Sequence, residues 1–214
     1  MTKVLIVDDD AYVRNSLRTI LGSQGIDVVG EADDGDQVPE KIARHRPDVV
    51  LIDLQMARVG GEEAIRRNAD RPEAPRFVAL TNFGSEDAVM RVLRAGAAGF
   101  LSKDDDPMTL AAHLNAVAEG GAALSSGAAS AVIRRSAPTR HTKVTTARTQ
   151  LAQLTDRERE VAALVAGHTN DQIGRRLNMS PNTVKAHVKN ATTKLDLVSR
   201  AELAVVVALA SIDA

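Results

Sequence analysis

Five short apolar runs recur along residues 1–124 and alternate with stretches of helical spacing. The runs lie at 4–7 (VLIV), 27–30 (DVVG), 49–52 (VVLI), 77–80 (FVAL) and 99–101 (GFL). In the intervening and following stretches, apolar residues stand three and four positions apart, as at Leu110, Leu114 and Val117. Strands that alternate with helices form a parallel sheet covered on both faces. The pattern predicts an α/β domain with a five-stranded, parallel, doubly wound sheet.

Charge divides the chain into two halves. Residues 1–124 carry 14 Lys and Arg against 21 Asp and Glu, whereas residues 125–214 carry 13 against 7. This asymmetry predicts two modules with different partners, the second of them a candidate for binding nucleic acid. Most of the positive excess lies in residues 125–150, so charge alone does not identify a DNA-binding surface.

The composition and the first residues limit where the protein works. The chain has no cysteine, which excludes disulfides and thiolate metal sites. It begins MTKVLIVDDD, without the layout of a signal peptide, and no apolar run reaches membrane-spanning length. We expect a soluble, cytoplasmic protein with no membrane partner.

The second half divides into a linker and a small helical domain. Residues 125–150 are rich in Ser, Ala, Thr and Arg and contain no acid, which predicts a linker that is helical only over 128–135. Residues 151–214 carry marked helix starts: three fit capping boxes (Thr155 with Glu158, Thr169 with Gln172, Ser199 with Glu202), and Ser180 precedes a proline. They predict an all-α domain with helices at 156–166, 170–177, 181–195 and 200–210.

Acidic and polar residues follow the predicted strands. Asp8 and Asp9 come after the first strand, Asp53 after the third, and Thr81 and Lys103 after the fourth and fifth. With a strand order of 2-1-3-4-5, the first and third strands are neighbours and ligands bind at their carboxyl ends. Three carboxylates in one crevice repel one another and favour Mg²⁺, which prefers oxygen ligands. A carboxylate there can also accept a phosphoryl group, whose charge the metal and the lysine would neutralise.

The segments VLIVDDD, DVVLIDLQM, ALTNF and GAAGFLSKD resemble the receiver domain of response regulators, over residues 1–124. The resemblance implies a flavodoxin-like fold in which Asp53 is the phospho-acceptor and a sensor histidine kinase is the donor. It further implies Mg²⁺ held by Asp9, Asp53 and the backbone carbonyl of Gln55, with Asp8 acting mainly through water. It also implies that Thr81 and Phe100 form a switch pair and that Lys103 is the cation beside the phosphate.

The predicted helix 181–195 has an apolar face, a polar face with Lys185 and Lys189, and an N-terminus whose free N–H groups favour a phosphate. The sequence from LTDREREV to SRAEL resembles the LuxR-type helix-turn-helix, and together with the receiver the chain is similar to the NarL/FixJ class of response regulators. The resemblance implies that Lys185, Ala186 and Lys189 face base edges. It places five residues near the DNA backbone, where contacts position the protein: Thr169, Ser180, Asn182, Thr183 and Arg200.

Four residues depart from the family pattern. Ala57 stands where such receivers usually have proline, and Asn82 where they usually have Ala, Gly or Thr, which leaves the rigidity of the acceptor loop and the phosphoryl lifetime open. Gly174 stands where the helix-turn-helix commonly has alanine, and Ala191 where it has a larger apolar residue, and we expect both to reduce packing in the bundle.

The last predicted helix carries LAVVVALA at 203–210 and is apolar on more than one side. Val205 and Leu209 are candidate contacts of a homodimer, and burial against the linker or the receiver is the alternative. We expect a DNA-binding transcriptional regulator of promoter DNA, in which phosphorylation draws Thr81, Lys103 and Phe100 inward and rebuilds the adjoining face.

Three other classes of protein remain to be separated from this one. Phosphatases of the haloacid-dehalogenase type need a second aspartate two residues after the acceptor, where this chain has Gln55, so we expect no enzyme beyond phosphoryl transfer to the protein itself and its own dephosphorylation. A DNA-binding protein that works without phosphorylation is the second class, and the intact acidic set argues against it. A small-molecule-sensing LuxR relative is the third, and the aromatic-poor first half offers it no obvious pocket.

Overall fold

The first half of the chain is a parallel α/β sandwich. A computed structural model describes residues 1–71, 73–82, 86–124 and 137–211. Within them lies one six-stranded parallel sheet of order β2-β1-β3-β4-β5-β6. The strands are β1 Lys3–Val7, β2 Asp27–Ala32, β3 Val49–Ile52, β4 Arg76–Thr81, β5 Gly99–Ser102 and β6 Ala123–Leu124. The predicted order is confirmed, and the two-residue β6 is an addition to the five predicted strands.

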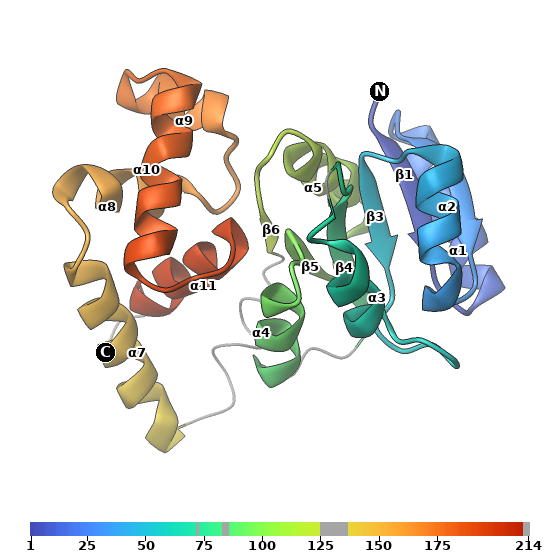
Figure 1. Ribbon diagram of the computed structural model, residues 1–214, viewed down its shortest axis with the longest axis horizontal. Helices are drawn as coiled ribbons and strands as arrows, with labels where there is room; N and C mark the ends of the chain where they lie inside the picture. The colour runs from blue at the N-terminus through green and yellow to red at the C-terminus, as the bar shows by residue number, and fades with distance from the viewer. Residues whose placement is uncertain (72, 83–85, 125–136, 212–214) are drawn as a thin grey trace.

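Helices cover both faces of the sheet, as the alternating pattern predicts (Figure 1). They are α1 Ala11–Ser23, α2 Val38–His45, α3 Gly61–Asn68, α4 Glu86–Arg94 and α5 Leu110–Ala118, with 3₁₀ turns η1 Gly35–Gln37 and η2 Pro107–Thr109. Alternate residues of β1 show the division: Val4 and Ile6 pack with α1 and α5, whereas Leu5 and Val7 pack with α2, α3 and α4. The carboxyl ends of the strands are thereby held at one edge of a two-sided core.

The second half is a helical bundle whose starts agree with the predicted caps. Its helices are α7 Ala137–Ala152, α8 Asp156–Leu164, α9 Asn170–Leu177, α10 Pro181–Lys194 and α11 Arg200–Ala210. Thr155 and Thr169 form complete capping boxes, and Ser180 caps α10. At α11 the box is incomplete, because the Glu202 carboxylate accepts from the backbone N–H of Val198 and not from the cap residue.

Helix α7 corrects the prediction for the linker. Residues 137–150 were expected to be irregular, yet they belong to a 16-residue helix that packs along α11 and buries Val144 and Ala147. Tertiary packing against an apolar partner outweighs the weak helix propensity of a threonine-rich segment. The helix predicted at 128–135 lies outside the described residues.

The two halves are in contact through α11, which lies next to α4 and β6 in Figure 1. Ala201 and Val205 of α11 belong to the same buried apolar cluster as Val89 of α4 and Phe100 of β5. The Arg94 guanidinium pairs with Glu202 at 3.4 Å. A backbone bridge also joins Ala122 to Ala166, so the loop between α8 and α9 extends the sheet edge. Across the described residues, no helix is both long and apolar enough to pass through a bilayer.

Val205 and Leu209, the candidate dimer contacts, pack against other residues of the same chain. Val205 is 2% exposed, and Leu209 packs against the same cluster of receiver residues. The spare apolar surface of α11, predicted as a dimer contact, is covered by the first domain in this structure. The alternative prediction was burial against the linker or the receiver, and α11 packs against both α7 and the first domain.

Candidate functional site

Three carboxylates meet at the carboxyl edge of the sheet, as predicted. Asp8 and Asp9 follow β1, and Asp53 follows the neighbouring strand β3. One oxygen of each carboxylate lies within 4.8 Å of the others. Asp8 and Asp53 are buried whereas Asp9 is exposed, so the group opens to solvent on one side. The crevice is the switch point of a 2-1-3-4-5 sheet, where ligands bind in this architecture.

Backbone contacts fix the two buried carboxylates. The Asp53 N–H donates to the Val7 carbonyl at 2.8 Å, which continues the ladder between β1 and β3 past the strand end. The Leu54 N–H donates to Asp53 Oδ1 at 2.8 Å, and the Asp10 N–H donates to Asp8 Oδ1 at 3.0 Å. Asp53 is thus held by main-chain atoms. Its second carboxylate oxygen, Oδ2, lies near Lys103 Nζ.

Lys103 reaches into the carboxylate group. Its Nζ lies 2.6 Å from Asp8 Oδ2 and 3.4 Å from Asp53 Oδ2, while its backbone N–H donates to the Thr81 carbonyl at 3.0 Å. Burial raises the pKa of the Asp53 carboxyl, with Asp8 adding to the rise and Lys103 opposing it. Burial opposes the charge of Lys103, but its hydrogen bond to Asp8 and the two negative charges raise its pKa overall. One lysine leaves the three acids undercompensated.

The donor set fits Mg²⁺. Its atoms are carboxylate oxygens from two adjacent strand ends, the ligand type this ion prefers, and the three acids face a single lysine. Gln55, whose carbonyl the family resemblance adds to the set, lies two residues after Asp53 in an exposed part of the loop. Asp8, Asp9 and Asp53 are the residues that would hold the ion.

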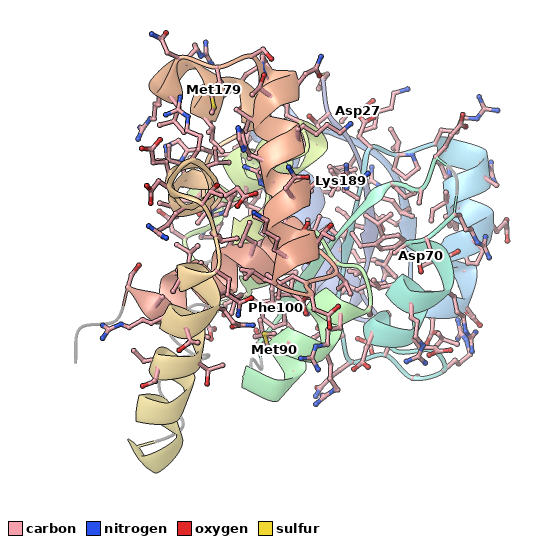
Figure 2. The ribbon with its side chains drawn as sticks, turned by 60° about the vertical axis from the view of Figure 1, so that its left-hand side comes forward. Asp27, Asp70, Met90, Phe100, Met179 and Lys189 are labelled. Atoms are coloured by element: carbon pink, nitrogen blue, oxygen red, sulfur yellow. The ribbon has the colours of Figure 1, made fainter. Side chains whose placement is uncertain are left out.

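The predicted switch residues are both buried. Thr81 ends β4 and is 3% exposed, and Phe100 in β5 is 1% exposed. Sequence analysis predicted that Phe100 moves inward on phosphorylation, yet here it is already packed inside, with Met90 of α4 against the same cluster (Figure 2). In this structure the burial of Phe100 and the contact with α11 occur together, and the inward movement of Phe100 on phosphorylation stays a prediction.

A groove of about 350 Å³ adjoins the acidic site. It runs between α1 and α5, with Asn82 and Lys103 at the end near the carboxylates and Leu17 and Leu110 in its apolar floor. The exposed side chain of Tyr12 stands on its rim. A partner seated in this groove would have its reactive group close to Lys103.

Helix α10 presents the predicted recognition face. Lys185, Ala186 and Lys189 are exposed, while Val184 and Val188 on the other side are buried in the bundle (Figure 2 labels Lys189). At its N-terminus Asn182 is exposed, and Ser180 Oγ lies 2.8 Å from Thr183 Oγ1 and accepts from the Thr183 N–H. The arrangement matches a helix that enters a groove N-terminus first.

Two residues that were predicted to lie near the DNA backbone form hydrogen bonds within the helical bundle. Thr169 is 4% exposed, and its hydroxyl caps α9 by accepting from the Gln172 N–H. The Arg200 guanidinium donates to Asn170 Oδ1 at 2.5 Å and to the carbonyls of His168 and Val165. Burial lowers the pKa of Arg200 to about 10. Both residues hold the α8–α9 corner together, and their predicted place near the DNA backbone stays a prediction.

Gly174 also departs from expectation. A Cβ at this position would lie 2.6 Å from the Met179 carbonyl oxygen, so the turn between α9 and α10 approaches α9 too closely for alanine. Gly174 therefore allows a tight helix-turn-helix, where sequence analysis predicted only lost packing.

The fold and this pair of sites define a response regulator that joins a receiver to a helix-turn-helix. Residues 4–115 match the response regulator receiver domain, and residues 152–207 match the bacterial regulatory proteins of the luxR family. The chain belongs to these families and is a transcriptional response regulator of the two-component type.

Characterised relatives share this organisation over nearly their whole length. The chain is 35% identical to the transcriptional regulatory protein LiaR of Bacillus subtilis, over 96% of each chain. It is 35% identical to the nitrate/nitrite response regulator protein NarL of Escherichia coli, over 94% of this chain and 93% of NarL. The crystal structure of ChrA, a response regulator of a heme-sensing two-component system, matches with a TM-score of 0.54 and 28% identity over 96% of this chain and 95% of ChrA.

Proposed function

We propose that Asp53 accepts a phosphoryl group from a sensor histidine kinase and that this controls binding of the α10 face to promoter DNA. The observation that carries the proposal is the meeting of Asp8, Asp9, Asp53 and Lys103 at one sheet edge, in a chain that also carries an exposed recognition helix. Mg²⁺, when bound, supplies charge neutralisation for the phosphoryl oxygens.

The chemistry follows from the protein's own groups. An Asp53 carboxylate oxygen attacks the phosphorus of a phosphohistidine, a P–O bond forms as the P–N bond breaks, and the imidazole leaves. Lys103, already within 3.4 Å of the acceptor, lies where the phosphoryl oxygens gain negative charge. Thr81, which ends β4, would donate its hydroxyl to one of them. Attack by water on the phosphorus of phosphorylated Asp53 would release inorganic phosphate, restore the Asp53 carboxylate and end the signal without another enzyme.

The donor is expected in the groove between α1 and α5. That groove ends at Asn82 and Lys103, offers an apolar floor, and has an open rim at Tyr12. A helical kinase segment could bury apolar side chains there while its phosphohistidine faces Asp53. This accounts for a groove next to the acidic site with no occupant from the described part of the chain.

Coupling to DNA would run through β5 and α11. Lys103 directly follows β5, and Phe100 of that strand shares an apolar cluster with Ala201 and Val205. A phosphoryl group on Asp53 changes the forces on Lys103, and hence on the surface that α11 covers. Release of α11 would free Val205 and Leu209 for a homodimer that reads two DNA half-sites.

The test measures promoter-fragment binding by wild type and Asp53→Asn, each with and without acetyl phosphate. We expect acetyl phosphate to strengthen binding of wild type alone. The exposed Asp70→Asn variant, treated in the same way, should behave as wild type. Equal affinity of wild type and Asp53→Asn in all four conditions would remove the switch and leave DNA binding intact.

A further inference from the structure

The loop that follows the acceptor is held at both of its ends. At its beginning the Leu54 N–H donates to Asp53 Oδ1, and the Gly61 N–H donates to the Leu54 carbonyl at 3.1 Å. A Cβ on Gly61 would lie 2.1 Å from the Asp53 carbonyl oxygen, so the chain folds back directly onto the acceptor. The position of residues 54–60 therefore bears on the geometry of the acidic site.

A buried carboxylate from another part of the sheet holds the far end of this loop. Asp34, after β2, is 1% exposed and accepts from the backbone N–H groups of Arg58 and Val59, both at 2.8 Å. Burial by itself would raise the pKa of Asp34, but these two donors, with Asp36 N–H and the charge of Arg58, lower it overall. In the same turn the Gly35 N–H donates to the Val59 carbonyl at 3.1 Å.

The Arg58 side chain adds a second tie to the same turn. Its Nε lies 2.7 Å from Asp36 Oδ2 and its Nη2 lies 3.0 Å from Asp36 Oδ1, a two-point contact, while Nη2 also lies 3.1 Å from Asp33 Oδ1. A planar guanidinium that grips one carboxylate at two points restricts both partners in orientation. Backbone and side chain of Arg58 are thus both bound to residues 33–36.

We infer that Asp34 and Arg58 are positioning residues of the acceptor site, because they hold the loop that carries Gln55. They supply the restraint that a proline would give at the position of Ala57. Proline restricts a loop through its fixed φ angle, and that restriction is missing here. Neither residue touches the carboxylate group itself; each acts through the main chain between Asp53 and Gly61. The inference rests on the proposed function, because it matters only where this loop contributes to Mg²⁺ binding and phosphorylation.

The experiment compares full-length Arg58→Ala, Arg58→Ala with Ala57→Pro, and Arg67→Ala. Arg67 is the matched control, because its side chain is as exposed as that of Arg58 (56% against 53%) and also pairs with a carboxylate. Mg²⁺ alone is titrated and followed by the amide NMR signals of Gln55 and Gly61. Phosphorylation by acetyl phosphate is then measured across acetyl phosphate concentrations at saturating Mg²⁺.

We expect Arg58→Ala to raise the Mg²⁺ midpoint about threefold to tenfold, with Arg67→Ala unchanged and the added Ala57→Pro returning the midpoint to within about twofold of wild type. At saturating Mg²⁺ the phosphorylation rate of Arg58→Ala should approach that of wild type, which a general loss of folding would not allow. Asp36→Asn, which keeps one oxygen acceptor, should shift the Mg²⁺ midpoint in the same direction by a smaller amount. It provides the second test of the inference if the proline variant does not fold.

An unchanged Mg²⁺ midpoint in both Arg58→Ala and Asp36→Asn overturns the inference, as does a shift of equal size in Arg67→Ala. A shift that a folded Ala57→Pro variant fails to reverse overturns the claim that Arg58 replaces the proline. The proposed function fails in a different way, because it is lost when wild-type protein takes up no phosphoryl group, whatever the Mg²⁺ midpoints of the variants.

Discussion

The two lysine-bearing sites of this protein differ in their exposure to water. Lys103 is half-buried between Asp8 and Asp53, and a charge added there acts in a poorly solvated environment. Lys185 and Lys189 on α10 are exposed, and charges there are screened beyond roughly 8–10 Å at physiological salt. A charge added at the acidic site therefore acts strongly on its buried neighbours. The exposed lysines of α10 are screened from that charge by salt and water.

Packing contacts must therefore carry the signal between the domains. Helices α10 and α11 belong to one bundle, but α11 also packs on a second side, against α4 and β6. A change at Lys103 can reach β5 through the backbone and α11 through the cluster around Phe100.

The largest effect is expected at the buried site. Lys103→Gln removes the cation that the two buried carboxylates share, so phosphoryl uptake from acetyl phosphate should fall about 10²- to 10³-fold. Intact-protein mass spectrometry over time measures the rate, and the exposed Lys3→Gln should match wild type. A Lys103→Gln rate within a few-fold of wild type would mean that the charge of Lys103 is not what makes the site reactive.

The exposed face should respond more weakly and with a different signature. Lys189→Ala should cost roughly 1–3 kcal/mol, about 5-fold to 150-fold in Kd, on DNA fragments selected by wild type, if Lys189 contacts a base. Fluorescence anisotropy at several salt concentrations measures it, with unrelated DNA as the internal control. An equal loss on both DNAs, with a salt slope smaller by about 1, would assign Lys189 to a phosphate.

The receiver site was largely predictable from the sequence because its geometry follows from topology. Asp9 and Asp53 meet since adjacent parallel strands end at the same edge, whatever the details of packing. The helix starts at Thr155, Thr169 and Ser180 were predictable for a similar reason, since a cap is read within four residues.

What the sequence did not predict depends on partners distant in the chain. Arg200 binds the carbonyls of the α8–α9 corner, and a family resemblance at its own position could not distinguish that from a DNA phosphate. Helix α7 forms because α11 offers it an apolar surface, and the pair of Arg94 with Glu202 joins two domains. No local spacing rule encodes contacts of this kind.

The contact between the domains should show a smaller effect than either site. Arg94→Ala removes the ion pair to Glu202, and because the arginine side chain is 71% exposed the pair contributes only about 0.2–1 kcal/mol. Unphosphorylated protein should then bind DNA up to about fivefold more tightly, since closure is weakened. Arg91→Ala is the matched control, because Arg91 lies on the same helix but pairs with Glu62 inside the receiver. Equal gains in both variants, or none in Arg94→Ala, would remove this ion pair from the coupling.

The smallest effect is a pH-dependent change in stability at the buried site. Because the pKa of Asp53 is raised in the folded protein, its contribution to stability is complete below the ordinary value of 3.8 and is lost as the pH rises through the raised value. Asp53→Asn should therefore be more stable than wild type near neutral pH without divalent ions, by at most a few degrees in Tm, since about 1 kcal/mol moves Tm by roughly 2–4 °C in a chain of this size. The gain should shrink as the pH falls towards 4 and should be cancelled by Mg²⁺, which stabilises wild type preferentially.

Thermal unfolding across pH measures this difference in stability, with Asp70→Asn as the exposed control. A wild-type protein that is the more stable of the two in Mg²⁺-free neutral buffer would show that Lys103 alone balances the charges of Asp8 and Asp53.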